Sequence, residues 1–183
     1  GNNVDDFWKN LVAGKSGAAP ITLFDASKFK TQFACEVKNF DPQDYIDRKD
    51  VRKMDRFSHF GLVTAAQAVE DSGIAEGTDP DRIGVIFGSG IGGLDTFMQE
   101  CLGFAQGDGT PRFNPFFIPK MISDIAAGHI SMKYGFRGPN FATVSACASS
   151  TNALIDAFNY IRLGMADAIL AGGSEATITV AGI

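Results

Sequence analysis

Three apolar segments separated by helical patterns constrain the fold of this chain more than any other feature of the sequence. They cover residues 82–88 (RIGVIFG), 141–146 (FATVSA) and 167–173 (DAILAGG). Short apolar runs between turn signals are typical of strands that are buried on both faces. Strands that alternate with helices predict an α/β fold with a largely parallel sheet.

Helical spacing of apolar residues is clearest near the start of the chain, at Val4, Phe7, Trp8 and Leu11. Further helices are predicted over residues 52–72, 94–105, 119–134 and 148–163, the last with an apolar face of Leu154, Ala157, Phe158 and Ile161. A short strand is expected within residues 33–40, and residues 107–119 read as an irregular aromatic loop.

The length of 183 residues suits one domain or part of a larger one. Three predicted strands are few for an α/β sheet, and the chain stops shortly after the third of them. We therefore expect residues 1–183 to form a single domain that is cut at both ends from something larger.

Composition excludes several classes of protein. No apolar run approaches the ~18 residues of a membrane helix, and the net charge of −5 argues against a general nucleic-acid binder. Cys35, Cys101 and Cys147 are widely spaced, so neither a disulfide framework nor a zinc site is expected. Unpaired cysteines suit a reducing compartment, so we expect a cytoplasmic protein. The cysteine spacing also leads us to expect that it uses no metal.

Cys147 is the strongest candidate for chemistry, because it lies where the segment FATVSA meets the helix predicted over 148–163. The N-terminal end of a helix carries partial positive charge, which stabilises a thiolate. Small neighbours allow a substrate to approach closely, and backbone amides there could hold an oxyanion. The alternative is a buried structural cysteine, which is the interpretation given to Cys35 and Cys101.

Residues 88–93 (GSGIGG) form a second candidate site, because they match the GxGxxG pattern between a strand and a helix. This pattern is typical of dinucleotide-binding turns, but the full fingerprint also needs a second strand that ends in Asp or Glu. The corresponding region here is the aromatic loop. A tight turn beside a substrate or another subunit is the competing interpretation.

Five basic residues fall within nine positions of this acidic chain: Arg48, Lys49, Arg52, Lys53 and Arg56. They indicate either a docking patch for an acidic partner or a solvated helix start with local ion pairs to the interleaved aspartates. The two histidines, His59 and His129, lie among apolar residues of predicted helices and read as structural. A base for a Cys147 nucleophile is therefore missing from this chain.

Several motifs resemble the β-ketoacyl-[acyl-carrier-protein] synthase family, especially the bacterial 3-oxoacyl-[acyl-carrier-protein] synthases II. The resemblance is carried, in order along the chain, by KMDRFSHFGLVTAAQAVEDSG, RIGVIFGSGIGGLDTF, NPFFIPKMISDIAAGHISMKYG, FRGPNFATVSACASS and LAGGSEA. It implies the N-terminal half of a thiolase-like fold, which is layered α-β-α-β-α in the full protein with helices flanking a mixed sheet. The family's catalytic histidines and lysine would lie in the other half.

The resemblance also implies roles for individual residues. Cys147 would accept an acyl chain as a thioester, and malonyl-[acyl-carrier-protein] would lose carbon dioxide and extend that chain to 3-oxoacyl-[acyl-carrier-protein]. Ile91 would gate the acyl pocket, and Phe116 would reach a pocket across a homodimer interface. The residues implied to dock the acyl carrier protein are Lys49, Arg52 and Lys53.

No cofactor is implied, because the substrate carries its own 4′-phosphopantetheine on the acyl carrier protein. Nucleic acid and membranes are not expected as partners. Three alternatives stay open at this point: a polyketide-type ketosynthase, a non-catalytic fragment that binds carrier protein, and a dinucleotide-dependent oxidoreductase that uses residues 88–93. We expect residues 1–183 alone to be inactive in condensation.

Overall fold

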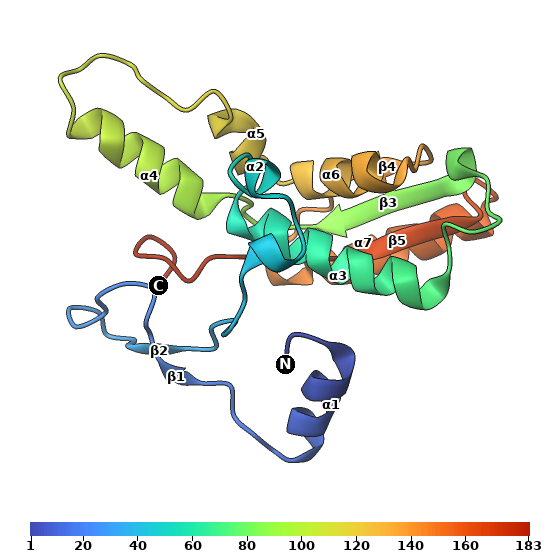
Figure 1. Cartoon of the computed structure of the whole chain (residues 1–183), viewed down its shortest axis with the longest axis horizontal. Coiled ribbons are helices and arrows are strands. Elements are labelled where there is room, and N and C mark those ends of the chain that lie inside the picture. The colour runs from blue at the N-terminus through green and yellow to red at the C-terminus, as the bar shows by residue number, and fades with distance from the viewer.

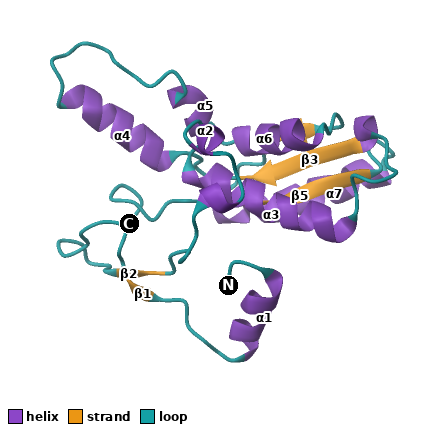
Figure 2. Ribbon diagram, viewed as in Figure 1, coloured by secondary structure: helices purple, strands orange, loops and turns teal.

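A computed structural model describes residues 1–183 as an α/β body with two extensions (Figures 1 and 2). The body is built on a three-stranded parallel sheet in the order β4–β3–β5. These strands cover Asn140–Phe141 (β4), Ile83–Gly88 (β3) and Ala168–Gly173 (β5). The expected α/β class and the parallel sheet are therefore confirmed.

Strand β3 is buried along its whole length and contributes to two separate cores. Ile83, Val85 and Phe87 belong to a cluster with helices α3 (Arg56–Ser72) and α6 (Ile125–Tyr134). Ile86 belongs to a second, smaller cluster with α7 (Ser149–Arg162). Because successive side chains of a strand point to opposite faces, the sheet is covered by helices on both sides.

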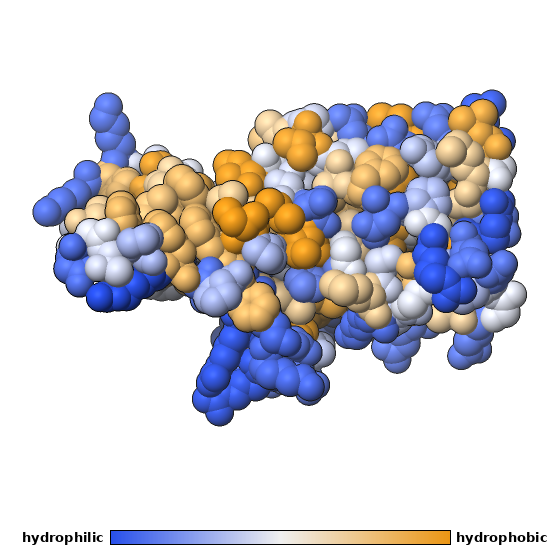
Figure 3. Space-filling view, turned by 90° about the horizontal axis from the view of Figure 1, so that it is seen from above, coloured by the Kyte–Doolittle hydropathy of each residue, from blue (hydrophilic) through white to orange (hydrophobic).

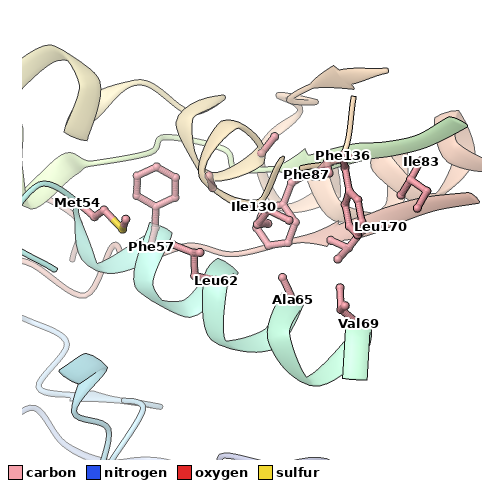
Figure 4. Close-up of a cluster of buried hydrophobic side chains, with 13 residues drawn as sticks. Met54, Phe57, Leu62, Ala65, Val69, Ile83, Phe87, Ile130, Phe136 and Leu170 are labelled. Carbon is pink, nitrogen blue, oxygen red and sulfur yellow. The ribbon is translucent and has the colours of Figure 1, made fainter. Parts of the chain in front are cut away.

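The larger cluster joins α3 to the sheet and to α6. In Figure 4 the α3 side chains Phe57, Leu62, Ala65 and Val69 point toward residues of β3, β5 and α6. Phe57 is fully buried, and burying a side chain of this size contributes about 1.5–3 kcal/mol. This core fixes the position of β3, whose end leads into the glycine-rich turn.

Helix α7 packs on the sheet through small residues rather than through its large ones. Ala153 and Ala157 are buried, whereas Leu154 and Phe158 are 56% and 60% exposed. Of the predicted apolar face, only Ala157 packs against the sheet. The backbones of α7 and β3 lie close together at Gly88: a Cβ on this residue would lie 2.5 Å from the carbonyl carbon of Ser149. The first turn of α7 thus rests directly on the end of β3.

The helix predicted over 119–134 is wrong as a single element, because it is divided into α5 (Phe117–Met121) and α6. The backbone at Ile122 is extended, and the carbonyl of Met121 accepts a hydrogen bond from the Gly93 N–H at 3.0 Å. A contact with the glycine-rich turn thus replaces the next helical hydrogen bond.

The strand predicted over 141–146 is much shorter than expected, since β4 ends at Phe141. The Ser145 N–H donates to Ser149 Oγ at 2.9 Å, and Thr143 Oγ1 donates to the Ser149 carbonyl at 2.7 Å. These residues therefore bond to the first turn of α7 instead of continuing the sheet.

Helix α3 begins at Arg56 rather than near residue 52, because Asp55 has extended backbone angles and its carboxylate caps the Phe57 N–H. A separate short helix, α2 (Arg48–Val51), precedes it. The helix predicted over 94–105 is confirmed as α4 (Leu94–Ala105). The N-terminal helix is confirmed as α1 (Val4–Val12), with Asn3 as its cap.

The two extensions bury little of their apolar surface. One holds α1 and the antiparallel pair β1 (Ala19–Pro20) and β2 (Phe33–Ala34), so only two residues of the strand expected within 33–40 form. The other holds α4, the loop after it and α5 (Figure 1). Apolar side chains gather on the surface over α4 and α5 (Figure 3).

Candidate active site

Cys147 lies on a sharp turn at the start of α7. It is the middle residue of the 3-10 turn Ala146–Ala148, which leads directly into the helix. Ala146 has a φ of +50°, a left-handed conformation that residues other than glycine rarely adopt. The turn leaves the Cys147 thiol exposed beside the helix N-terminus, in the position that the sequence predicts.

Ser149 holds this turn in place from within the fold. It is buried, and its hydroxyl donates to the Ala146 carbonyl at 2.7 Å while it accepts from the Ser145 N–H at 2.9 Å. Asn152 Nδ2 donates to Ser145 Oγ at 2.6 Å. A network in which each buried polar group has a partner rigidifies its surroundings, so the backbone on both sides of Cys147 is fixed.

A pocket of about 410 Å³ opens in front of this turn. Its walls are the turn that carries Cys147, the glycine-rich turn after β3 and the residues just after β5. Ile91 is the single large apolar side chain in the lining and is 54% exposed. The structure therefore places Cys147 and Ile91 in one pocket, although they are 56 positions apart in the sequence.

Glu175 also lines this pocket, and the sequence reasoning gave it no role. Its carboxylate accepts hydrogen bonds from the N–H groups of Gly90, Ile91 and Gly92 at 2.6, 3.2 and 3.3 Å. The available signal was its position, because Glu175 is the second residue after a predicted strand and parallel strands end at one edge of a sheet.

The contacts of Glu175 argue against the dinucleotide interpretation of residues 88–93. In a dinucleotide-binding turn, backbone N–H groups and the following helix N-terminus bind the pyrophosphate. Here Glu175 occupies the N–H groups of the turn. Asp55, buried beneath α4, accepts from the Thr96 N–H at 3.1 Å and from Thr96 Oγ1 at 2.5 Å. Two carboxylates thus hold the donors that a phosphate would need.

Phe116 does not line the Cys147 pocket. It lies just before α5 and is 42% exposed. Its neighbour Phe117 packs instead in an aromatic cluster, with ring centroids 6.2 Å from Phe97 and 5.6 Å from Phe113. Phe117 therefore packs within the extension.

The basic cluster lies on and just after α2. Lys49 and Arg52 are exposed, whereas Lys53 pairs with Asp50 at 2.8 Å. Arg56 lies over the rings of Phe40 and Phe60, with its guanidinium carbon 5.7 and 5.1 Å from their centroids. The cluster thus divides into three exposed charges that could meet a partner, Arg48, Lys49 and Arg52, and two residues, Lys53 and Arg56, that have partners within the chain.

Neither histidine lines the Cys147 pocket. His59 is buried, and its Nε2 lies 3.0 Å from the Val51 carbonyl oxygen. Burial lowers the pKa of His59, with a smaller opposing effect of the Val51 hydrogen bond. Burial also lowers the pKa of His129. Both residues fit the structural role expected from the sequence.

The expectation that Cys35 and Cys101 are buried is wrong, because both are exposed free thiols, and burial therefore does not distinguish them from Cys147. Cys35 lines a larger cavity of about 560 Å³ that does not include Cys147. The position at a helix N-terminus separates Cys147 from the other two. No cluster of three or more His, Cys, Asp or Glu side chains is arranged to hold a metal. None of the helices has both the length and the apolar character needed to cross a membrane.

Comparisons with known proteins identify the family of this chain. Residues 1–183 match the family described as "Beta-ketoacyl synthase, N-terminal domain". The chain is 44% identical over 181 residues to "3-oxoacyl-[acyl-carrier-protein] synthase 2" of Staphylococcus aureus, a match that covers 98% of this chain and 44% of that protein. The chain therefore spans less than half the length of this curated relative.

Solved structures show the same architecture. The ishigamide ketosynthase/chain length factor matches with a TM-score of 0.76 at 25% identity, over 92% of this chain and 47% of that one. A type II polyketide synthase ketosynthase, bound to a hexaketide and in complex with its acyl-carrier protein, matches with a TM-score of 0.74 at 25% identity over 79% and 42%. These matches confirm the thiolase-like fold, and the chain belongs to the β-ketoacyl synthase family.

Proposed function

We propose that the complete protein is a condensing acyltransferase, a 3-oxoacyl-[acyl-carrier-protein] synthase of type II fatty acid synthesis. The observation that carries this proposal is Cys147, exposed on a fixed turn at the start of α7 and open to a pocket. The 44% identity to a 3-oxoacyl-[acyl-carrier-protein] synthase 2 supports the choice of reaction.

The proposed chemistry begins with Cys147. Its sulfur attacks the carbonyl carbon of an acyl thioester, the bond to the carrier thiol breaks, and the acyl chain stays on Cys147. Malonyl-[acyl-carrier-protein] then loses carbon dioxide, and the resulting carbanion attacks the Cys147 thioester. A carbon–carbon bond forms and the Cys147 thiolate leaves. Backbone amides near the turn, including that of Cys147, would stabilise the oxyanions of both steps.

Proton transfer in this reaction is assigned to groups outside residues 1–183, because His59 and His129 lie away from the pocket. We therefore propose that residues 1–183 form one N-terminal domain that needs the remainder of the protein for condensation. The catalytic histidines and lysine implied by the family resemblance would supply that part.

The proposed partner is an acyl carrier protein, whose 4′-phosphopantetheine brings the substrate, so the enzyme needs no cofactor of its own. Lys49 and Arg52 are exposed and suit an acidic carrier, with Lys53 beside them. Phe116, exposed on the α5 extension, would contact a second subunit in a homodimer. We place the activity in the cytoplasm, where isolated thiols remain reduced.

A polyketide-type ketosynthase is the weaker alternative. The matched polyketide ketosynthase shares 25% of its residues with this chain over the aligned part, against 44% for the fatty acid relative. A dinucleotide-dependent enzyme is disfavoured because Glu175 and Asp55 occupy the phosphate-binding donors.

The test is acyl transfer by the complete protein, followed by intact mass spectrometry. Incubation with acyl-[acyl-carrier-protein] should add one acyl group, and Cys147→Ser should lower the rate by at least about a thousandfold. Cys101→Ser, a matched exposed cysteine on α4, should leave the rate unchanged. Retained acyl transfer in Cys147→Ser would refute the assignment. In the same assay Lys49→Glu should raise KM for the carrier protein with kcat unchanged.

A further inference from the structure

Glu175 is the only charged side chain that lines the Cys147 pocket, and it is bound to the backbone of the opposite wall. One carboxylate oxygen, Oε2, accepts from the N–H groups of Gly90 and Ile91. The other, Oε1, accepts from the Gly92 N–H and from Ser89 Oγ, each at 3.3 Å. Four donors on four consecutive residues therefore converge on one side chain, and hydrogen bonds to an ionised acceptor are the stronger kind.

The backbone that carries Glu175 is itself anchored. Gly88 and Gly173 are paired at the ends of the parallel strands β3 and β5. The next residue, Ser174, donates its N–H to the Gly88 carbonyl at 3.1 Å and its hydroxyl to the Phe57 carbonyl at 2.7 Å. Glu175 thus extends from a point fixed to the sheet and to α3, and it holds the glycine-rich turn from there.

The turn has little room to move toward Cys147. A Cβ at Gly90 would lie 2.9 Å from Glu175 Oε2 and 3.3 Å from the Ala146 Cα. Gly90 therefore packs closely against both the carboxylate and the turn that carries Cys147. Because Ile91 follows Gly90, the hydrogen bonds from this backbone to Glu175 help to set the distance between Ile91 and Cys147.

We propose that Glu175 is a positioning residue, which fixes Ile91 as an apolar wall of the pocket and so favours binding of an apolar acyl chain beside Cys147. The claim that an acyl chain is the substrate rests on the proposed function. The positioning itself rests on the four hydrogen bonds. Because the Ile91 backbone is already fixed, it does not have to be ordered when an acyl chain binds, and this lowers the entropic cost of binding that chain.

The test compares two alkylating reagents on Cys147 of the complete protein, iodoacetamide and N-dodecyl iodoacetamide. In each case a bond forms from sulfur to carbon and iodide leaves, so enzymatic activity is not needed. Intact mass spectrometry gives both rates, and the measured quantity is the ratio of the dodecyl rate to the iodoacetamide rate. We expect Glu175→Gln to lower this ratio about tenfold, because an amide NH₂ would face backbone N–H donors.

Two further variants keep the result interpretable. Ser89→Ala removes one of the four donors and should lower the ratio about threefold, which carries the test if Glu175→Gln fails to fold. Glu76→Gln, an exposed glutamate outside the pocket lining, should leave the ratio unchanged.

A ratio within about twofold of the wild-type value in both Glu175→Gln and Ser89→Ala would overturn the proposal, as would an equal shift in Glu76→Gln. If the wild-type protein forms no acyl-enzyme, the proposed function fails, yet the alkylation ratio still reports on Glu175. The two failures are therefore distinguishable.

Discussion

The body and the two extensions both carry large apolar side chains, but only the body buries them. All thirteen members of the main core cluster fall between Met54 and Leu170. Helix α1 has no buried residue, and its Phe7 and Trp8 are 55% and 63% exposed. In α4, Thr96 is the only buried residue.

This difference separates helix formation from burial. Helix α1 has the spacing of an amphipathic helix and an Asn3 cap, and these local features suffice to predict it. Burial of its apolar face requires a surface from another segment, which residues 1–183 do not provide. We expect the rest of the complete protein or a second subunit to contact these extensions.

The largest expected effect tests the two regions directly. Phe57→Ala removes a fully buried ring of the body and should lower the free energy of unfolding of the complete protein by about 3–5 kcal/mol. Trp8→Ala removes an exposed ring and should cost no more than about 0.5 kcal/mol. Urea unfolding measures both values. A loss above about 2 kcal/mol for Trp8→Ala would break the comparison and show that α1 is covered in the complete protein.

Two glycines give a second contrast, of intermediate size. Gly88→Ala would bring a methyl group within 2.5 Å of the Ser149 backbone and should destabilise the protein by about 1–3 kcal/mol. Gly103→Ala, in α4, meets no atom within 4 Å and should stabilise the protein by about 0.5–1 kcal/mol. Thermal unfolding followed by circular dichroism should show shifts of opposite sign. A stabilising shift for Gly88→Ala would contradict the close contact of α7 with β3, whereas a destabilising shift for Gly103→Ala would show that this site in α4 is covered in the complete protein.

The smallest effect is a pH dependence that belongs to the body, because both histidines of the chain lie there. Burial lowers the pKa of His59, so the unfolded state binds more protons as the pH falls below about 6.5. The contribution of His59 to the free energy of unfolding should therefore be complete above that pH, and the free energy of unfolding should decrease by about 1 kcal/mol toward pH 5.

Urea unfolding at pH 7.5 and pH 5.5 measures this decrease. His59→Gln should make the profile flatter, and His129→Gln should do so too because burial lowers its pKa as well. An unchanged slope in both variants would assign the pH dependence to other groups.

Local signals predicted much of the fold. The helix over 94–105 has the predicted bounds, and the strand over 82–88 begins one residue later, at Ile83. The errors arose where contacts between distant segments replaced the local pattern. The Gly93 N–H interrupts the helix at Met121, and Ser149 draws Ser145 away from the sheet.

The same limit applies to the site. The sequence predicts the place of Cys147, because a strand-to-helix junction is a local feature. That Ile91 lies in the same pocket came from the family resemblance. The position of Glu175 after a strand was the only local signal, and its hydrogen-bond partners could not be predicted, since they lie 83–86 positions away. Spacing along the chain carries no information on such contacts, whereas the pairing of Gly88 with Gly173 explains them.

The strand order β4–β3–β5 has a consequence for how the chain behaves in isolation. Strand β5 is six residues long and has a neighbour on one side only, so a row of backbone N–H and C=O groups along its outer side is unpaired within the sheet. Unpaired strand edges are templates for adding another strand. Self-association through β5, rather than weakness of the Phe57 core, is therefore what we expect to limit the concentration at which residues 1–183 stay monomeric.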